Sequence, residues 1–156
     1  MKHIFHIILL AALVLPMASC AQKVSDEIRQ IFPEARNAVD KGAWTEVQGK
    51  KGSVIGYVAY SKPASNGIRG YNGETPLRIA FDSKKRIISV QLLPNSETPS
   101  FVNRVSDAGY FKSWNGLSVK EALNHKVDAV SGATFTSTSV RKSLEACLRE
   151  ISKSTK

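Results

Sequence analysis

The sequence predicts an α+β fold in which helices cover an antiparallel sheet. The clearest sign is a hairpin, because apolar residues alternate over residues 77–81 and again over 88–92, with a polar turn at residues 82–85 between them. The second sign is a long C-terminal helix, since apolar residues recur at helical spacing over residues 140–151. The chain has 156 residues, enough for one domain. We therefore expect a single domain from about residue 25 onward.

The remaining elements are expected to be short. Ser25 is followed by two acidic residues, which is typical of a capped helix start. Pro99 fixes its own φ and suits the first position of another helix. We expect strands over residues 44–47 and 53–61, a helix from residue 25 with a second turn over 35–39, and helices over 99–105 and 118–123.

Strict alternation also predicts which strand residues share a face. In the strand over residues 53–61, Val54 and Val58 should share one face, and Ile55 and Tyr57 the other. In the returning strand of the hairpin, the same rule places Ile88, Val90 and Leu92 on one face.

The N-terminus is typical of an exported protein. Lys2 gives a positive start, residues 4–15 are nearly all apolar, and Pro16 and small residues follow. This run is too short to span a bilayer comfortably. Residues 17–20, Met-Ala-Ser-Cys, resemble a bacterial lipoprotein cleavage box, which implies that Cys20 becomes the lipidated first residue. The alternative is a plain secreted protein that is cut near Cys20.

We therefore expect a lipoprotein signal peptide over residues 1–19, a tether over 20–24 and the folded domain over 25–156. The protein would be exported and lipid-anchored to a bacterial membrane, facing the periplasm or the outside. An acylated Cys20 cannot pair with Cys147, the second of the two cysteines. Because Cys147 lies in the apolar stripe of the last helix, we expect a buried free thiol.

Charge and composition limit the partners. The net charge of +9 favours acidic partners or anionic surfaces. Lys and Arg are scattered, without a basic block or a nucleic-acid motif, so we expect no nucleic-acid binding. The cysteines and histidines show no metal-ligand spacing, so we expect no metal site.

The candidate site lies in residues 127–137, where small and hydroxyl-bearing residues precede the last helix. Gly132 allows a positive φ or the close approach of another group. A helix beginning near Ser137 would present unpaired N–H groups to an anion, so this segment suits a phosphate, with Thr134 or Thr136 as the most exposed hydroxyl. The alternative is that these residues only cap the helix.

Several motifs resemble the FMN-binding domain family, which includes the G-type subunit of Rnf electron-transport complexes and the C-type subunit of the sodium-pumping NADH:quinone oxidoreductase. The resemblance covers residues 67–140. The matching segments, in order, are Gly70-Tyr71-x-Gly73 with Pro76-Leu77, Glu97-Thr98-Pro99, Trp114, and Asp128-x-x-Ser131-Gly132-Ala133-Thr134 with Thr136-Ser137.

The resemblance implies that FMN is joined to Thr134 through a phosphoester. It also implies that residues 25–156 form an FMN-binding domain, and that Tyr57 and Tyr60 contact the flavin or simply pack in the sheet. The cofactor-binding residues it implies are Thr134, Ser131, Gly132, Ala133, Thr136, Asp128, Glu97 and Thr98.

The same resemblance implies the partners. A separate flavin transferase, using FAD as donor and Mg²⁺ on its own side, would attach the FMN, and Asp128 would be recognised during that encounter. The protein would then carry electrons from a membrane redox donor to an extracytoplasmic acceptor, as a carrier rather than an enzyme in its own right. The alternatives are a lipoprotein that binds FMN or another phosphorylated metabolite without a covalent bond, and a purely structural envelope protein.

Overall fold

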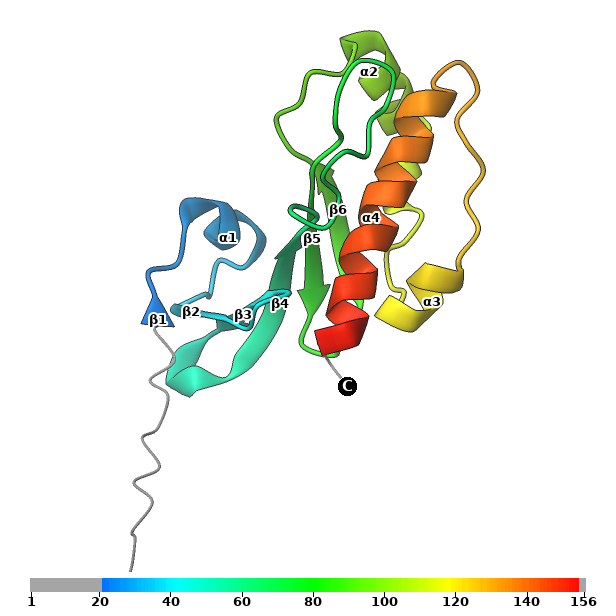
Figure 1. Ribbon diagram of the computed structural model, residues 1–156. Coiled ribbons are helices and arrows are strands. Elements are labelled where there is room, and N and C mark those ends of the chain that lie inside the picture. Colours follow the sequence, from blue (N-terminus) through cyan, green and yellow to red (C-terminus); the bar gives the residue numbers. More distant parts are fainter. Residues whose placement is uncertain (1–20, 155–156) are drawn as a thin grey trace, which may run out of the picture.

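The computed structural model describes residues 21–154 and confirms the predicted α+β fold (Figure 1). Its sheet has six strands in the order β1-β2-β3-β4-β5-β6, and each strand pairs antiparallel with the next. The strands are β1 (Ala21–Gln22), β2 (Asn37–Asp40), β3 (Thr45–Gln48), β4 (Val54–Tyr60), β5 (Leu77–Asp82) and β6 (Ile87–Leu92). The expected signal peptide, residues 1–19, and Cys20 lie outside the described residues.

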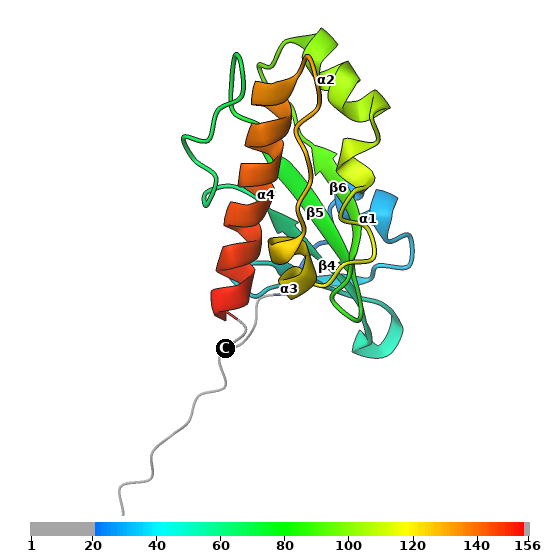
Figure 2. The same cartoon turned by 90° about the vertical axis from the view of Figure 1, so that its right-hand side faces the viewer.

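The helices lie on both faces of this sheet. They are α1 (Asp26–Ile31), α2 (Pro99–Asp107), α3 (Val119–Asn124) and α4 (Thr134–Ser154), with 3₁₀ turns η1 (Lys50–Gly52) and η2 (Tyr110–Lys112). Side chains cap two of them: Ser25 Oγ accepts from the N–H of Ile28, and Ser118 forms a capping box with Glu121. In Figures 1 and 2, α4 runs along one side of β5 while α1 lies on the opposite side.

Each face of the sheet has its own core. The main core packs the sheet against α2, α3 and α4, and its fully buried members include Leu77, Ile79, Phe81, Val105, Trp114, Leu144, Leu148 and Ile151. The second core packs α1 on the other face, through Val24, Ile28, Phe32, Ala35, Ala38, Val47, Val58 and Ala80. Cys147 belongs to the main core as a buried free thiol, as expected, and burial raises its pKa to about 12.

A β-bulge overturns the predicted facing of β6. Phe81 pairs with Ile87 and Ala80 with Ser89, so Ile88 is an extra residue with no partner. The bulge turns Ile87 into the core, where it is 0% exposed, while Ile88 is 40% exposed. A second register shift, between β3 and β4, gives Ile55 the same unpaired position, so Val54 packs toward the main core and Ile55 toward the second. Strict alternation fails at both strands for this reason.

Two expectations near the N-terminus are wrong. Residues 35–39 do not continue the first helix, because residues 37–40 form β2 and pair with β3. That pairing buries Ala38 and Val39, an apolar gain that outweighs local helix preference. Residues 21–24 are not a free tether either, since Ala21 and Gln22 pair with β2 and Val24 is buried.

Among residues 21–154, no helix combines the length and the apolar character needed to cross a lipid bilayer.

The bulge in β6 makes a matched pair of variants informative. We expect Ile87→Ala to lower the free energy of unfolding by about 3 kcal/mol, since it removes a fully buried side chain from the main core. Ile88→Ala, one residue away, should cost less than about 1 kcal/mol. Urea denaturation of both variants measures the difference, and equal losses would contradict the bulge.

Candidate functional site

Three segments distant in sequence meet at one end of the molecule. They are the loop between β4 and β5 (residues 61–76), the turn that leads from β6 into α2 (residues 93–98), and the start of α4. Figures 1 and 2 both place the start of α4 beside α2 and the β4–β5 loop, at the end opposite to the C-terminus. The sequence segments that carry the motifs are thus brought together by the fold.

The buried carboxylate of Glu97 joins these three segments. Its Oε1 accepts hydrogen bonds from the backbone N–H groups of Asn72 (2.8 Å) and Gly73 (2.7 Å). Its Oε2 accepts from the N–H of Tyr71 (3.2 Å) and from the hydroxyl of Thr136 (2.5 Å). A carboxylate accepts such bonds at both oxygens, so one side chain fixes the loop and α4 to the turn.

These hydrogen bonds set the protonation state of Glu97. Burial by itself raises the pKa of a carboxyl group, but the hydrogen bonds from Thr136 and from the three N–H groups outweigh burial here. The pKa of Glu97 therefore lies below its ordinary value of 4.5, and the group is ionised at neutral pH.

Gly70 makes the approach of Glu97 possible. A Cβ at position 70 would lie 2.8 Å from Cδ and Oε1 of Glu97, closer than two such atoms can approach. The turn is closed by a 2.7 Å hydrogen bond from the N–H of Gly70 to the carbonyl of Gly73. The first glycine of the 70–73 motif therefore makes room for the carboxylate.

The last helix begins at Thr134, three residues earlier than expected. Gly132 has a φ of +73° in the preceding turn, which the N–H of Ala133 closes on the carbonyl of Val130 at 3.0 Å. Ser137 ties this turn to the helix, since its Oγ accepts from the N–H of Val130 and donates to the carbonyl of Ala133. In the described part of the chain, nothing accepts hydrogen bonds from the N–H groups of residues 134–136.

Burial separates the hydroxyls of this segment. Thr136 is 1% exposed and donates to Glu97, so its prediction as a candidate for the most exposed hydroxyl is wrong. Ser137 and Ser139 are also buried, and Thr75 hydrogen-bonds Ser139 at 2.9 Å between the loop and α4. The packing reading therefore holds for these three residues. Ser131 and Thr134 are the exposed hydroxyl-bearing residues between residues 131 and 139.

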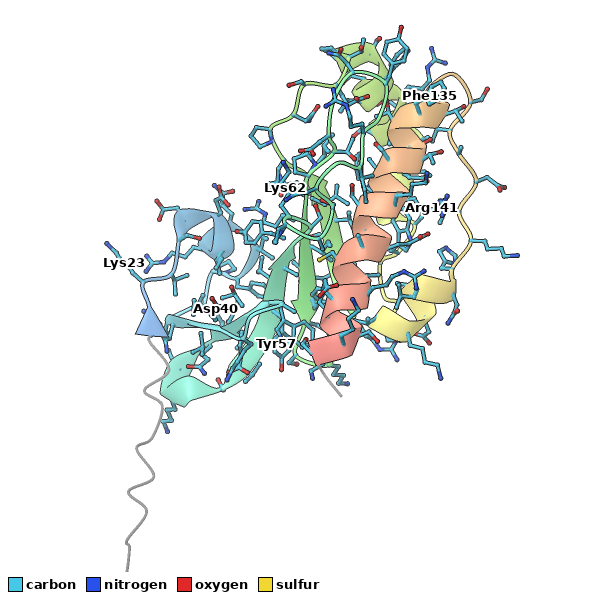
Figure 3. The ribbon with its side chains drawn as sticks, in the orientation of Figure 1. Lys23, Asp40, Tyr57, Lys62, Phe135 and Arg141 are labelled. Atoms are coloured by element: carbon cyan, nitrogen blue, oxygen red, sulfur yellow. The ribbon has the colours of Figure 1, made fainter. Side chains whose placement is uncertain are left out.

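A small pocket of about 300 Å³ opens beside Thr134. Its lining is mostly apolar and consists of Tyr71, Phe101, Gly132, Ala133, Thr134, Phe135 and Thr136. Two of its aromatic side chains are unusually open, since Tyr71 is 64% exposed and Phe135 is 69% exposed. Figure 3 shows Phe135 at the start of α4. Exposed rings beside unpaired N–H groups suit a ligand that has both a flat ring and an anionic end.

The other predicted site residues do not line this pocket. Ser131 is exposed and does not line the pocket, and Thr98 supports it indirectly, because its carbonyl starts α2 and thereby places Phe101. Asp128 is exposed and lines a separate groove with residues 123–129 and α4. Cofactor contact by Asp128, Glu97 and Thr98 stays a prediction.

Two tyrosines suggested from the sequence serve other purposes. Tyr57 stacks on Trp44 with ring centroids 4.5 Å apart, and Tyr60 donates a hydrogen bond to Glu27 at 3.4 Å. Neither lines the pocket at Thr134. Tyr60 borders a larger cavity of about 750 Å³ by Trp44 and the end of α4. We place the candidate site at the smaller pocket, because the exposed hydroxyl and the unpaired N–H groups lie there.

Sequence reasoning missed Arg104, Phe135 and the open ring of Tyr71. Arg104 projects from α2 onto the backbone of Gly132, where a Cβ would lie 3.2 Å from Nη1 and 3.3 Å from Nε. The only sequence signal for Phe135 was its place directly after Thr134. Nothing local in the sequence connects Arg104 to a residue 28 positions later, since the contact depends on how α2 packs beside α4.

The role of Glu97 predicts a pH dependence. Because its pKa is lower in the folded chain than in the unfolded chain, its contribution to stability is present above pH 4.5 and is lost as the pH falls further. Glu97→Gln should cost about 2 kcal/mol at pH 7, since an amide cannot accept all four hydrogen bonds. In this variant the free energy of unfolding should also fall less as the pH is lowered from 7 to 3, which denaturant unfolding measures.

Glu34→Gln is the control for this experiment, because Glu34 is exposed and belongs to neither core. It should leave both stability and its pH dependence nearly unchanged. A Glu97→Gln variant with the pH dependence of the parent would show that Glu97 does not hold the three segments as a carboxylate.

Comparison with known proteins identifies the family to which this part of the chain belongs. The family model of the FMN-binding domain matches residues 70–149, just over half of the chain. The matched range contains Glu97, Arg104 and every residue that lines the pocket at Thr134. A search of curated proteins finds no match. This family indicates a flavin-binding redox role, and the chain belongs to the FMN-binding domain family.

Proposed function

We propose that the protein is an extracytoplasmic electron-transfer flavoprotein that carries FMN through a phosphoester on Thr134. One observation supports this residue above the others. Thr134 is an exposed residue that lies at the start of α4 and lines the pocket, whereas Thr136 and Ser137 are buried. Ser131 is exposed too, but it lies outside both the pocket lining and the helix.

The residues present fit both parts of FMN. The unpaired N–H groups at the start of a 21-residue helix suit the phosphate, and the helix dipole adds roughly 0.3–1 kcal/mol for an anion there. Tyr71, Phe101 and Phe135 offer apolar surface for the flavin ring. When bound, FMN supplies the oxidation and reduction chemistry, while the chain supplies attachment, orientation and electrostatics.

Attachment requires help from another protein. An ordinary threonine hydroxyl needs a base to take its proton, and in the described structure Glu97, the carboxylate fastened to this segment, is already occupied by Thr136 and three N–H groups. We infer that a flavin transferase binds FAD and Mg²⁺ and supplies the base. The Thr134 oxygen then bonds to the phosphorus that carries the flavin, the bond to the second phosphate breaks, and AMP leaves.

Asp128 suits recognition by that transferase. Its side chain is exposed and lies on the loop before α4, in the groove formed by residues 123–129 and one side of the helix. An enzyme that reaches Thr134 would contact this loop as well. The proposal therefore gives Asp128 a role in maturation and gives the pocket residues a role in holding the cofactor.

The exposed pocket also suits electron exchange with large partners. Tyr71 and Phe135 are open to solvent at the end of the molecule, so a membrane redox donor and an extracytoplasmic acceptor could each approach the flavin. Export and lipidation at Cys20 would keep the carrier at a membrane surface, and the phosphoester would keep it from losing FMN. The chain would act as a carrier rather than as an enzyme by itself.

Flavin attachment can be tested directly by intact mass. Coexpressed with a flavin transferase and supplied with FAD and Mg²⁺, the mature chain should gain the mass of one FMN minus one water. Thr134→Ala should lose the whole increment while keeping its fold, whereas Ser131→Ala, the matched exposed hydroxyl, should keep it. Peptide mapping should place the adduct on the peptide that contains Thr134.

Acid precipitation separates this proposal from its alternatives. Covalent flavin precipitates with the protein, while FMN that is held without a bond stays in the supernatant. An adduct on Ser131 or Thr136 would correct the residue but keep the function. A colourless chain beside an active transferase would overturn the electron-carrier proposal.

Lipid anchoring predicts a change in localisation. The parent chain should fractionate with membranes and shift to the aqueous phase in detergent partitioning after Cys20→Ala, because the acyl chains provide the attachment. Cys147→Ala, the other cysteine, should stay with the membranes. A Cys20→Ala protein that still partitions with membranes would rule out lipidation at this residue.

A further inference from the structure

The guanidinium of Arg104 lies directly over the turn that precedes α4. Three of its atoms would be 3.2–3.3 Å from a Cβ at Gly132, so the plane of the side chain rests against that backbone. Gly132 is two residues before Thr134 and lines the same pocket. A Cβ at position 132 would require the guanidinium to shift by a few tenths of an ångström.

Arg104 also has no acidic partner among the described residues. Three other arginines form ion pairs, Arg78 with Glu27, Arg86 with Glu121 and Arg141 with Glu145. Nothing in residues 21–154 accepts a hydrogen bond from the Arg104 side chain. A guanidinium has five donors, and their geometry matches the oxygens of a phosphate.

Two independent groups of donors therefore meet at one place. The N–H groups of residues 134–136 come from α4, and the guanidinium comes from α2, a separate helix. The N–H groups include that of Thr134 itself, and the guanidinium lies over Gly132, two residues before Thr134. We propose that Arg104 binds the phosphate of the flavin cofactor, an inference that uses the proposed function only to locate that phosphate at Thr134.

This proposal divides the cofactor between two sets of residues. Arg104 and the helix N–H groups would recognise the phosphate, and Tyr71, Phe101 and Phe135 would contact the ring. FMN and riboflavin share the ring and differ in the phosphate. Arg104 should therefore affect the binding of FMN alone, whereas a residue that merely supports the fold would affect both ligands equally.

The experiment measures the dissociation constants of free FMN and riboflavin for the mature chain purified without transferase, by quenching of flavin fluorescence. The parent should prefer FMN. Arg104→Gln should weaken FMN binding about tenfold, the size of one charge-assisted hydrogen bond, and should leave riboflavin binding unchanged. Arg104→Lys should retain part of the preference, because it keeps the charge but loses the planar set of donors.

Arg149→Gln is the matched control. Arg149 is exposed, lies on α4 and forms no ion pair in the described part of the chain. It is 15 residues beyond Thr134, about 22 Å along the helix. Its loss removes the same charge and should not change the preference for FMN. Raising the salt concentration should reduce that preference in the parent and have less effect in Arg104→Gln.

Three results would overturn the role of Arg104: an unchanged FMN affinity in Arg104→Gln, an equal loss for FMN and riboflavin, or a parent that shows no preference for FMN, including one that binds neither ligand. The covalent link is judged separately by mass. If Thr134 is flavinylated but Arg104→Gln binds free FMN as tightly as the parent, only the inference about Arg104 fails. If the chain is never flavinylated but prefers FMN through Arg104, only the proposal of a covalent link fails.

Discussion

The site depends on the carboxylate of Glu97, which receives four hydrogen bonds from two other segments of the chain. An ionised group without these donors would be costly in the interior, and the donors would be unsatisfied without the carboxylate. The loop over residues 61–76 and the start of α4 are therefore fixed relative to each other. Gly70 is required for the same reason, because only a residue without a Cβ leaves room for the carboxylate.

This arrangement explains why several buried hydroxyls lie near the exposed residue Thr134. Thr136 binds Glu97, Ser137 fastens the preceding turn, and Ser139 bonds Thr75 on the loop. Each satisfies a polar group that the close packing of the helix would otherwise bury unpaired. Among the serines and threonines of residues 131–139, Thr134 alone is exposed and lines the pocket. Thr136, Ser137 and Ser139 thus serve packing, while the functional reading of Thr134 stays a proposal.

Local patterns predicted the parts of the fold that depend on local chemistry. The hairpin, the cap at Ser25 and the long last helix follow from alternation, capping residues and helical spacing. The strand at residues 37–40 could not be predicted in this way, because its stability comes from pairing with β3. The bulge at Ile88 escaped prediction for a related reason, since it depends on how two strands align. In the site, the same limit applies to Arg104, whose contact with Gly132 joins two helices.

The direction of α4 has a consequence for the range of electron transfer. The helix has 21 residues, about 30 Å at the usual rise, and β1 lies toward the end of the molecule opposite to Thr134 (Figure 1). A chain held to lipid just before β1 would therefore carry its flavin well above the bilayer surface. Under the proposed function, such a stand-off distance would suit exchange with water-soluble proteins or bulky extracellular oxidants and would keep the ring away from quinones dissolved in the hydrocarbon layer.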